Sequence, residues 1–441
     1  MNTRDRQILG IALPSIASNI TVPLLGIVDV AITGHLGSVV FIGAIAVGAM
    51  IFNLIYWIFG FLRMGTSGTT SQALGRRDLA EVARLLVRSL VAALVLAALL
   101  LVFRHPLLRM MLLLTAPTAD VAPLVADYFH ICIWGAPAML SLYGLSGWFI
   151  GMQNTRVPML AAIVQNVANI ALSLVFVCVF GMKLEGVALG TVVAQYAGVL
   201  VALVFLVLRY GRLRRYFSGD GLFARRAVAR FFSVNRDIFL RTLFLVAVNL
   251  YFTSAGARQG ATILAVNTML MQLFLLFSYV MDGFAYAGEA VGGRCFGARN
   301  RAAFTDTVRR LFVWGGLVTV TFTATYAIGG NAFLRLLTDN TAVIASASGY
   351  FPWALAIPAI GCAAFIWDGI FIGMTATRIM LLSSVLGAAA FFAVVSGLFP
   401  VIGNHSLWLA MLVFLAVRGI VQTAAYLLVW GNRRKRARIW G

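Results

Sequence analysis

The sequence is poor in charge, and poorest in acid. Its 441 residues include 34 Lys and Arg, 14 Asp and Glu, 4 His and 4 Cys, so charged residues make up 11% of the chain. Soluble globular proteins carry about a quarter charged residues, whereas 61% of this chain is hydrophobic. This composition excludes a soluble globular protein.

Motifs for enzymatic chemistry are also missing from the sequence. It contains no Walker motif, no nucleotide-binding domain and no catalytic constellation. The histidines form no ligand cluster, and the cysteines fall in or beside apolar runs without metal-like spacing, as small core residues do. We therefore expect neither an enzyme nor a bound cofactor or metal, and any transport would be driven by an ion gradient instead of ATP.

Long apolar runs recur along the whole chain. A membrane-spanning helix needs about 20 such residues to cross a hydrocarbon core of about 30 Å. Twelve runs reach this length, at 8–33, 40–62, 82–103, 124–148, 158–180, 186–208, 237–257, 261–287, 308–329, 349–373, 379–399 and 407–430. The sequence predicts an all-α integral membrane protein with 12 transmembrane helices.

The net charge of +20 would suit nucleic acid, but its distribution follows topology instead. With both termini inside, most Lys and Arg fall in connections and tails on one side, including the stretch from Arg209 to Arg241. This asymmetry obeys the positive-inside rule. We expect a multi-pass protein of the cell (inner) membrane with cytoplasmic termini and no nucleic-acid partner. The first apolar run is too long for a signal peptide, and we expect it to be retained as a helix.

The two halves of the chain repeat each other. Phe149 to Arg156 reads FIGMQNTR and Phe371 to Arg378 reads FIGMTATR, an offset of 222 residues with six of eight positions identical. The same offset relates QALGRR, which begins at Gln72, to RCFGAR, which begins at Arg294. One such match could arise by chance, but several in one order and register indicate a duplication.

The repeat predicts an amino-terminal six-helix lobe (1–209), a basic cytoplasmic linker (210–236), a carboxy-terminal six-helix lobe (237–432) and a basic tail (433–441). Because each half has an even number of spans, both enter the membrane from the same side and form two parallel lobes. The linker suits either an amphipathic segment on anionic lipid or a solvated tether.

The first span carries an acid and a proline that a passive anchor does not need. Asp29 lies 25 residues after Arg4, or about 37 Å along a straight helix, towards the outer face. A carboxylate in a membrane helix is costly unless it is paired, hydrated or protonated, which favours a function. Pro14 removes a backbone hydrogen bond and provides a hinge. The alternative is an anchor helix whose Asp caps its outer end.

Polar residues also concentrate in the fifth and sixth spans. Asn166, Asn169 and Ser173 are spaced 3 and 4 residues apart and so share one helical face, and Thr191 begins the next span. Such amides and hydroxyls could hold Asp29 and tune its pKa. Each taken alone could instead make an ordinary helix–helix packing bond.

Three further acids lie within apolar runs of the second half, at Asp282, Glu289 and Asp368. A desolvated carboxylate attracts an organic cation, and Phe284, Tyr286 and Trp367 could add cation–π contacts. These residues are therefore candidates to bind a cationic substrate. The alternative is that each acid neutralises a buried arginine, for which Arg241 and Arg418 are available.

Several stretches resemble the multidrug and toxic compound extrusion (MATE) transporters, in particular the DinF-like branch. They are SNITVPLLGIVDVAITGHLG (18–37), VNRDI (234–238), MDGFAYAGEAVGG (281–293), WDGIFIGMTATR (367–378) and GNHSLWLAM (403–411). The resemblance implies twelve helices in two lobes, and export of amphipathic compounds by proton or sodium antiport.

The same resemblance implies roles for individual residues. It makes Asp29 the protonation site, Pro14 the bend, and Asn169 and Thr191 members of the same network. Ser173 departs from the pattern, because many relatives carry aspartate there, which puts sodium binding in doubt. Asp368 matches a tenth-helix acid that other branches use in cation coupling.

We therefore expect a monomeric antiporter that exports small amphipathic organic cations, surrounded by membrane lipids and coupled to protons in preference to sodium. One alternative is a sodium-coupled exporter. Another is a lipid or lipid-linked-sugar flippase of the same superfamily, which would need a strongly cationic cavity. A non-transporting scaffold or receptor would not require buried acids or a repeat.

Overall fold

The computed structural model describes residues 3–34, 39–217, 219–338 and 340–431. Side chains are described in these ranges except at 22–34, 39, 331, 336–337, 342 and 429–431. Every regular element in these ranges is helical. The predicted all-α class is therefore confirmed.

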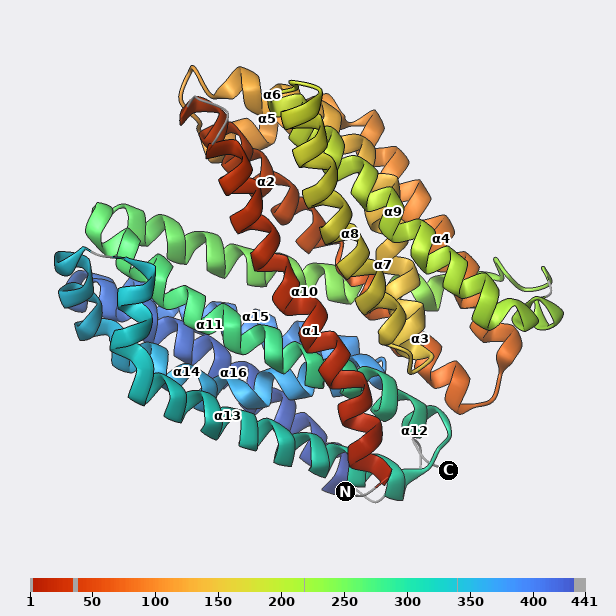
Figure 1. Cartoon of the computed structure of the whole chain (residues 1–441). Helices are drawn as coiled ribbons and strands as arrows, with labels where there is room; N and C mark the ends of the chain where they lie inside the picture. Colours follow the sequence, from red (N-terminus) through yellow and green to blue (C-terminus); the bar gives the residue numbers. More distant parts are fainter. Residues whose placement is uncertain (1–2, 35–38, 218, 339, 432–441) are drawn as a thin grey trace. The chain divides into compact units, whose positions relative to one another are not determined.

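Helices occupy nearly all of the amino-terminal half (Figure 1). In chain order they are α1 (Thr3–Gly34), α2 (Val39–Phe59), α3 (Phe61–Gly75), α4 (Leu79–Val102), α5 (Arg104–Thr115), α6 (Ala122–Cys132), the short η1 (Ile133–Gly135), α7 (Ala136–Gly151), α8 (Arg156–Leu174), the π-helical η2 (Val175–Val179), α9 (Leu184–Tyr210) and the short η3 (Gly211–Tyr216).

The carboxy-terminal half has the same character, with longer helices. They are α10 (Arg225–Ala257), α11 (Ala261–Ala287), the π-helical η4 (Gly288–Gly292), α12 (Gly293–Gly297), α13 (Arg301–Leu337), α14 (Thr341–Gly373), α15 (Thr377–Ile402) and α16 (Asn404–Gly431).

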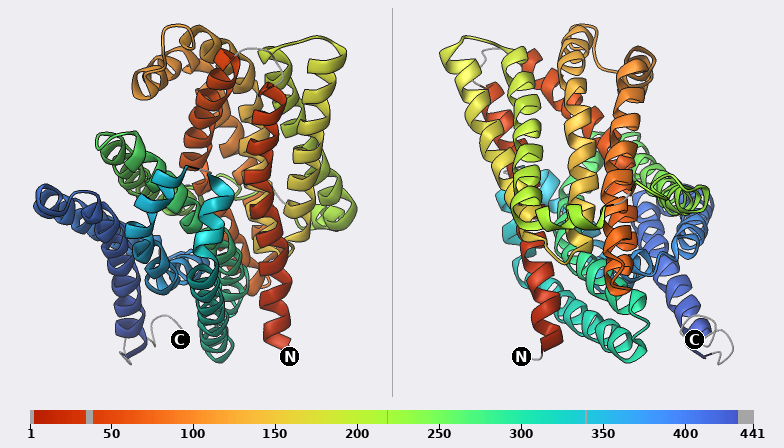
Figure 2. Two further views of the ribbon diagram at one scale, coloured as in Figure 1. Left: turned by 60° about the vertical axis from the view of Figure 1, so that its left-hand side comes forward. Right: turned by 90° about the vertical axis from the view of Figure 1, so that its right-hand side faces the viewer.

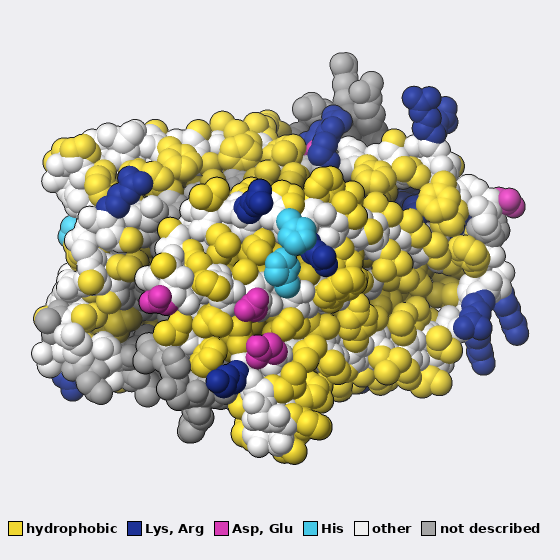
Figure 3. All heavy atoms as spheres, turned by 90° about the horizontal axis from the view of Figure 1, so that it is seen from above, with side chains coloured by type: hydrophobic (Ala, Val, Ile, Leu, Met, Phe, Trp, Pro, Cys, Tyr) yellow, Lys and Arg dark blue, Asp and Glu magenta, His cyan; other side chains and the backbone are white. Residues whose placement is uncertain are grey.

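The predicted spans correspond to these helices. Eleven candidate membrane spans occur in the part of the chain that was searched, which is its described residues. The twelfth predicted span lies in α1, whose 32 residues give about 48 Å of helix, enough to cross a bilayer. Hydrophobic side chains are widespread on the face seen in Figure 3, where scattered acidic, basic and histidine side chains interrupt them.

Two segments differ from the expectation from sequence. Residues 104–115 form α5 instead of a loop, because Leu108 and Met111 turn inward on one face of an amphipathic helix. The predicted connection at 210–236 is partly helical, because α10 already begins at Arg225 and buries Phe231 and Val234.

The chain forms two compact units, each visible as a bundle in Figures 1 and 2. One contains residues 17–231, and the other contains residues 3–16 together with the described residues from 232 onwards. The division near residue 231 falls inside the predicted linker. The other division cuts α1 between Ile16 and Ala17, two residues after Pro14.

The sequence repeat extends to backbone conformation. Gln153 and Thr375, 222 residues apart, have φ of 62° and 53°, a left-handed conformation that is uncommon outside glycine. In each turn the backbone N–H of the following residue donates to a carbonyl oxygen in the last turn of the helix. Asn154 N donates to Phe149 O and Ala376 N donates to Phe371 O, both at 2.9 Å. The two halves therefore end α7 and α14 with the same left-handed cap.

Two glycines in the same register allow close helix packing. A Cβ on Gly147 would lie 2.3 Å from the carbonyl oxygen of Arg63, and a Cβ on Gly369 would lie 2.2 Å from that of Ala285. Both distances are far shorter than a van der Waals contact, so only glycine fits. Such close backbone approaches hold helices together in lipid, where the hydrophobic effect does not.

Candidate functional site

A polar cluster lies between α8 and α9 in the unit of residues 17–231. Asn169 and Ser173 project from one face of α8 and are 2% and 0% exposed. The two helices approach closely because Gly190 of α9 has no side chain: a Cβ there would lie 2.6 Å from Ser173 Oγ. The contact of Asn169 with α9 runs through Thr191.

Hydrogen bonding determines how the Asn169 amide is oriented. Asn169 Nδ2 donates to Thr191 Oγ1 at 2.9 Å, and Thr191 Oγ1 donates to the carbonyl oxygen of Val187 at 3.0 Å. Because the one proton of the Thr191 hydroxyl is assigned to Val187, Thr191 accepts from Asn169, which orients the amide with Nδ2 toward Thr191. In this arrangement Asn169 Oδ1 is buried with no hydrogen-bond partner among the described atoms, and the same is true of Ser173 Oγ.

The same helix α8 also contacts α1. Asn166 Nδ2 donates to the carbonyl oxygen of Thr21 at 3.4 Å. Asn169, Ser173 and Thr191 therefore lie in one cluster, whereas Asn166 contacts α1. Asp29, the predicted protonation site, lies within α1, but its side chain is outside the described residues.

In the other unit, Asp368 of α14 is surrounded by basic and amide groups. Arg241 of α10 donates to Asp368 Oδ2, Arg418 of α16 donates to the same oxygen at 2.5 Å, and Gln422 Nε2 donates to Oδ1 at 2.7 Å. All four side chains are buried. The alternative in which an acid neutralises buried arginines therefore describes Asp368. Arg241 belongs to this cluster and not to the basic connection in which we had placed it.

The charges of this cluster do not cancel within it. Two guanidinium groups surround one carboxylate, and the Nε atoms of Arg241 and Arg418 have no hydrogen-bond partner among the described atoms. A buried surplus of positive charge is costly, so a further anion nearby is favourable. Asp282 of α11 is within electrostatic range of Arg418.

Trp367 and Glu289 are less accessible than a substrate site requires. The Trp367 indole donates to Thr423 Oγ1 at 2.7 Å, and its ring packs against Phe312 and Tyr426 with centroids 5.0 and 4.6 Å apart. Glu289 is buried in η4. Neither side chain has a face open to a ligand in this conformation.

Asp282 and Tyr286 remain partly exposed, one turn apart on α11. Tyr279, also partly exposed, lies one turn before Asp282 and interacts with it electrostatically. Reasoning from sequence missed Tyr279, although its spacing of 3 and 7 residues from the other two is a recognisable helical signal. The result is a carboxylate flanked by two phenol rings.

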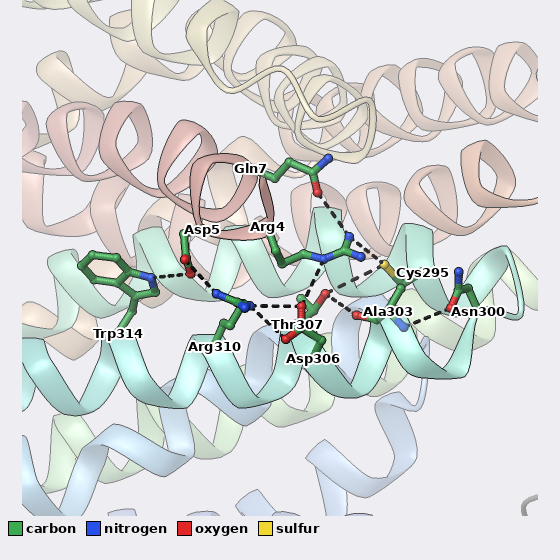
Figure 4. A network of polar contacts seen from close by, with 10 residues as sticks. All are labelled: Arg4, Asp5, Gln7, Cys295, Asn300, Ala303, Asp306, Thr307, Arg310 and Trp314. Atoms are coloured by element: carbon green, nitrogen blue, oxygen red, sulfur yellow. Dashed lines mark hydrogen bonds and ion pairs between the residues drawn. The ribbon is translucent and has the colours of Figure 1, made fainter. Parts of the chain in front are cut away.

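A third network ties the first turn of α1 to the first turns of α13 (Figure 4). Arg310 donates to Asp5 Oδ2 at 2.7 Å and to Asp306 Oδ1 at 2.9 Å, and the indole of Trp314 donates to Asp5 Oδ1 at 3.3 Å. Arg4 pairs with Asp306 at 3.7 Å and contacts the Cys295 thiol. The sequence contains a signal for this network, because Asp5 and Asp306 are acids within basic segments. Only the basic residues of these segments were interpreted, as evidence of membrane topology.

The chain matches the MatE family model over residues 14–175 and 238–398. It is 38% identical over 434 residues to DNA damage-inducible protein F of Escherichia coli (strain K12), covering 98% of this chain and 94% of that protein. Its fold is similar to that of a MATE protein crystallised in a bent conformation, at 17% identity, a TM-score of 0.85, and coverage of 99% and 96%. A mutant of the Vibrio cholerae MATE transporter VcmN gives 17% identity and a TM-score of 0.85, covering 98% of each chain.

Proposed function

Because the chain belongs to the MatE family of multidrug and toxin efflux transporters, we propose that it exports small amphipathic organic cations in exchange for protons. The family and its DinF-like branch agree with the resemblance seen in the sequence. The single observation that carries the coupling proposal is that the side-chain oxygens of Asn169 and Ser173 are buried and have no hydrogen-bond partner among the described atoms.

Helical register supports Asp29 as the group that these oxygens serve. α1 and α8 run in the same direction, because three candidate spans separate them along the chain. Thr21 and Asn166 are joined by a hydrogen bond. Asp29 lies eight residues beyond Thr21 and Ser173 seven beyond Asn166, so each is about 10–12 Å further along its helix. This register favours Asp29 and Ser173 at the same depth.

The chemistry of the Asn169 amide distinguishes the two protonation states of a carboxyl group. Its Oδ1 is a hydrogen-bond acceptor held in place by Thr191. A protonated Asp29 can donate to this oxygen, whereas an ionised Asp29 is repelled by it. Protonation would therefore draw α1 toward α8 and α9, and deprotonation would release it.

The division of α1 supports a movement of this kind. The helix belongs to one compact unit up to Ile16 and to the other from Ala17. Pro14 lies two residues before this division and lacks the amide hydrogen that would stiffen the helix there. A bend near Pro14 would let the segment that carries Asp29 move while residues 3–16 stay bound to the other unit.

For the substrate, we favour the face of α11 that bears Tyr279, Asp282 and Tyr286. A carboxylate between two phenol rings suits an organic cation, which gains both Coulomb and cation–π energy. Asp368, Glu289 and Trp367 would instead form the buried support behind this face, since Arg418 interacts with both Asp368 and Asp282.

Sodium is the second candidate for the coupling ion. The orphan oxygens of Asn169 and Ser173 are hard ligands of the kind that sodium accepts, as other hard cations do. Ser173 supplies a neutral oxygen where an aspartate would supply charge, and this weakens a sodium site and favours the proton. The flippase alternative needs an open cationic cavity, whereas Arg241 and Arg418 are buried against Asp368.

The family and the basic segments support a proposal for the membrane in which the protein lies and for the orientation of its termini. The chain is a multi-pass membrane protein, and we place it in the inner membrane as a monomer with both termini in the cytoplasm. Labelling of single cysteines introduced near either end, in intact and permeabilised cells, tests this orientation.

The decisive experiment is efflux of a fluorescent organic cation from proteoliposomes with the proton and sodium gradients imposed separately. A proton gradient alone should drive transport at zero sodium. Efflux driven by sodium alone at constant pH would assign the coupling to sodium. Transport of an anionic lipid analogue but not of the cation would favour a flippase.

A further inference from the structure

A hollow of about 630 Å³ lies at the first turns of α13, lined by Arg301, Ala302, Thr305, Asp306 and Arg309. Arg301, Thr305 and Arg309 are spaced four residues apart and so project from one face of the helix. The hollow is shallow and open to one side, and all of its lining residues belong to α13.

The charges around this hollow favour an anion. Its one acid, Asp306, is engaged by Arg310 and Arg4 (Figure 4). Arg301 and Arg309 are exposed and form no ion pair with any described carboxylate. Two guanidinium groups therefore line the hollow without a counter-ion among the described side chains. Guanidinium binds phosphate in a bidentate manner and keeps its charge at any physiological pH.

The row of side chains that begins at Arg309 becomes apolar immediately beyond the hollow. Val313, Leu317 and Val320 continue the row of Arg309 and are 63%, 55% and 67% exposed. They extend about 6, 12 and 16 Å from Arg309 along the helix. Basic residues at one end and an exposed aliphatic track at the other match an amphiphile with an anionic head and a hydrocarbon tail.

We propose that this face of α13 is a binding site for an anionic phospholipid. The phosphate of the headgroup lies between Arg301 and Arg309 in the hollow, and an acyl chain lies along Val313, Leu317 and Val320. The site is separate from the ion-coupling cluster and from the α11 face, and it does not depend on the transported substrate.

Native mass spectrometry of the purified full chain, titrated with phosphatidylglycerol or phosphatidylcholine, tests the site. Arg301→Gln/Arg309→Gln should weaken phosphatidylglycerol binding at least tenfold, the loss expected for about one charge-assisted hydrogen bond, and leave phosphatidylcholine unchanged. The matched control, Arg225→Gln/Arg226→Gln, removes the same charge from two other exposed arginines and should change binding less than twofold. Equal losses in both variants would mean diffuse attraction to basic residues and would overturn the proposal.

Two further arms separate a lipid from free phosphate and a binding effect from misfolding. Inorganic phosphate and glycerol phosphate at millimolar concentration should fail to displace phosphatidylglycerol; displacement by either would make this a free-phosphate site. Leu317→Ser should weaken a long-chain lipid more than a short-chain one, and no difference would refute the acyl track. Unfolding temperatures in neutral detergent should be the same for all variants, because the altered side chains are exposed.

Discussion

Asn169 donates from Nδ2 to Thr191 Oγ1 at 2.9 Å, which leaves its own Oδ1 buried without a described partner. Leaving a buried acceptor unpaired costs about 1–3 kcal/mol, so this position is unfavourable for the stability of the described conformation. Ser173, one turn further along α8, is in the same condition. Both observations are explained if a proton donor reaches the cluster in another protonation state of the transporter.

Asp29→Asn should abolish proton-driven efflux while the protein still inserts and folds. The substitution preserves shape and removes titration, so efflux should also lose its dependence on pH. Drug efflux from proteoliposomes across a pH gradient measures this, with Asp120→Asn, which alters an exposed acid between α5 and α6, as the matched control. Normal pH-dependent efflux by Asp29→Asn would exclude this residue from coupling.

Asn169→Leu should reduce coupled transport at least tenfold and leave thermal stability nearly unchanged. The variant loses the bond to Thr191, worth about 0.5–1.5 kcal/mol, but it also removes an unsatisfied buried acceptor, which offsets much of that loss. Asn249→Leu, which removes an amide bonded only within its own helix, should leave transport intact. A large fall in unfolding temperature for Asn169→Leu with transport retained would show a purely structural role.

Asp368→Leu should destabilise the protein by about 3–5 kcal/mol, because it leaves two buried guanidinium groups without their carboxylate. The double variant Asp368→Leu/Arg241→Leu should recover part of that loss by removing one of the stranded charges. Thermal unfolding in detergent measures both. If Asp368→Leu is as stable as the parent but binds cationic dyes more weakly, then Asp368 is a substrate ligand and its ion pairs are secondary.

Gly369→Ala should destabilise the carboxy-terminal unit by about 1–3 kcal/mol, because its methyl group would collide with the backbone carbonyl of Ala285. Gly316→Ala is the matched control: it also lies within a helix, but no atom lies within 4 Å of the added methyl group. This control should be neutral or slightly stabilising, because alanine favours helix. Equal unfolding temperatures for the two variants would contradict the close approach.

Asp5 and Arg310 should show a measurable coupling energy in a double-mutant cycle. Both side chains are partly exposed, at 16% and 25%, so the pair is worth less than a buried one, although Trp314 and Asp306 extend it into a network. Asp5→Asn, Arg310→Gln and the double variant provide the cycle, with Arg6→Gln in the same turn of α1 as a control. Additive effects of the two single variants would mean that the pair contributes nothing.

Much of the fold could be predicted because membrane helices obey a simple constraint. A segment in lipid must satisfy its backbone internally and must be long and apolar, so each predicted span corresponds to a helix or a pair of helices. The 222-residue repeat was equally visible, since the residues that end α7 and α14 are identical at most positions. α5 was missed because its apolar face is short and its length falls below that of a membrane span.

Helical spacing predicted some residues of the candidate sites but could not predict which residues from different helices meet. The face shared by Asn169 and Ser173 follows from helical spacing, and Thr191 of α9 bonds to Asn169, whereas the predicted role of these residues around Asp29 stays a prediction. Spacing cannot say which acid meets which arginine, because Arg241, Asp368 and Arg418 come from three helices separated by 127 and 50 residues. Tyr279 and the Asp5–Arg310 pair each left a signal in the sequence, but only the structure shows that Tyr279 is partly exposed and that α1 touches α13.

Composition, the long apolar runs and the internal repeat therefore determined the fold class and the spans of this protein, because each depends on local sequence and on the bilayer, whereas its family was recognised from the resemblance of several motifs. Tertiary structure alone decided the state of its charges: Asp368 is neutralised, Asn169 Oδ1 is left unpaired, and Arg301 and Arg309 face an open hollow. The physical reason is that a charge or a polar atom takes its energy from its neighbours in space, and in a helical membrane protein those neighbours come from other helices.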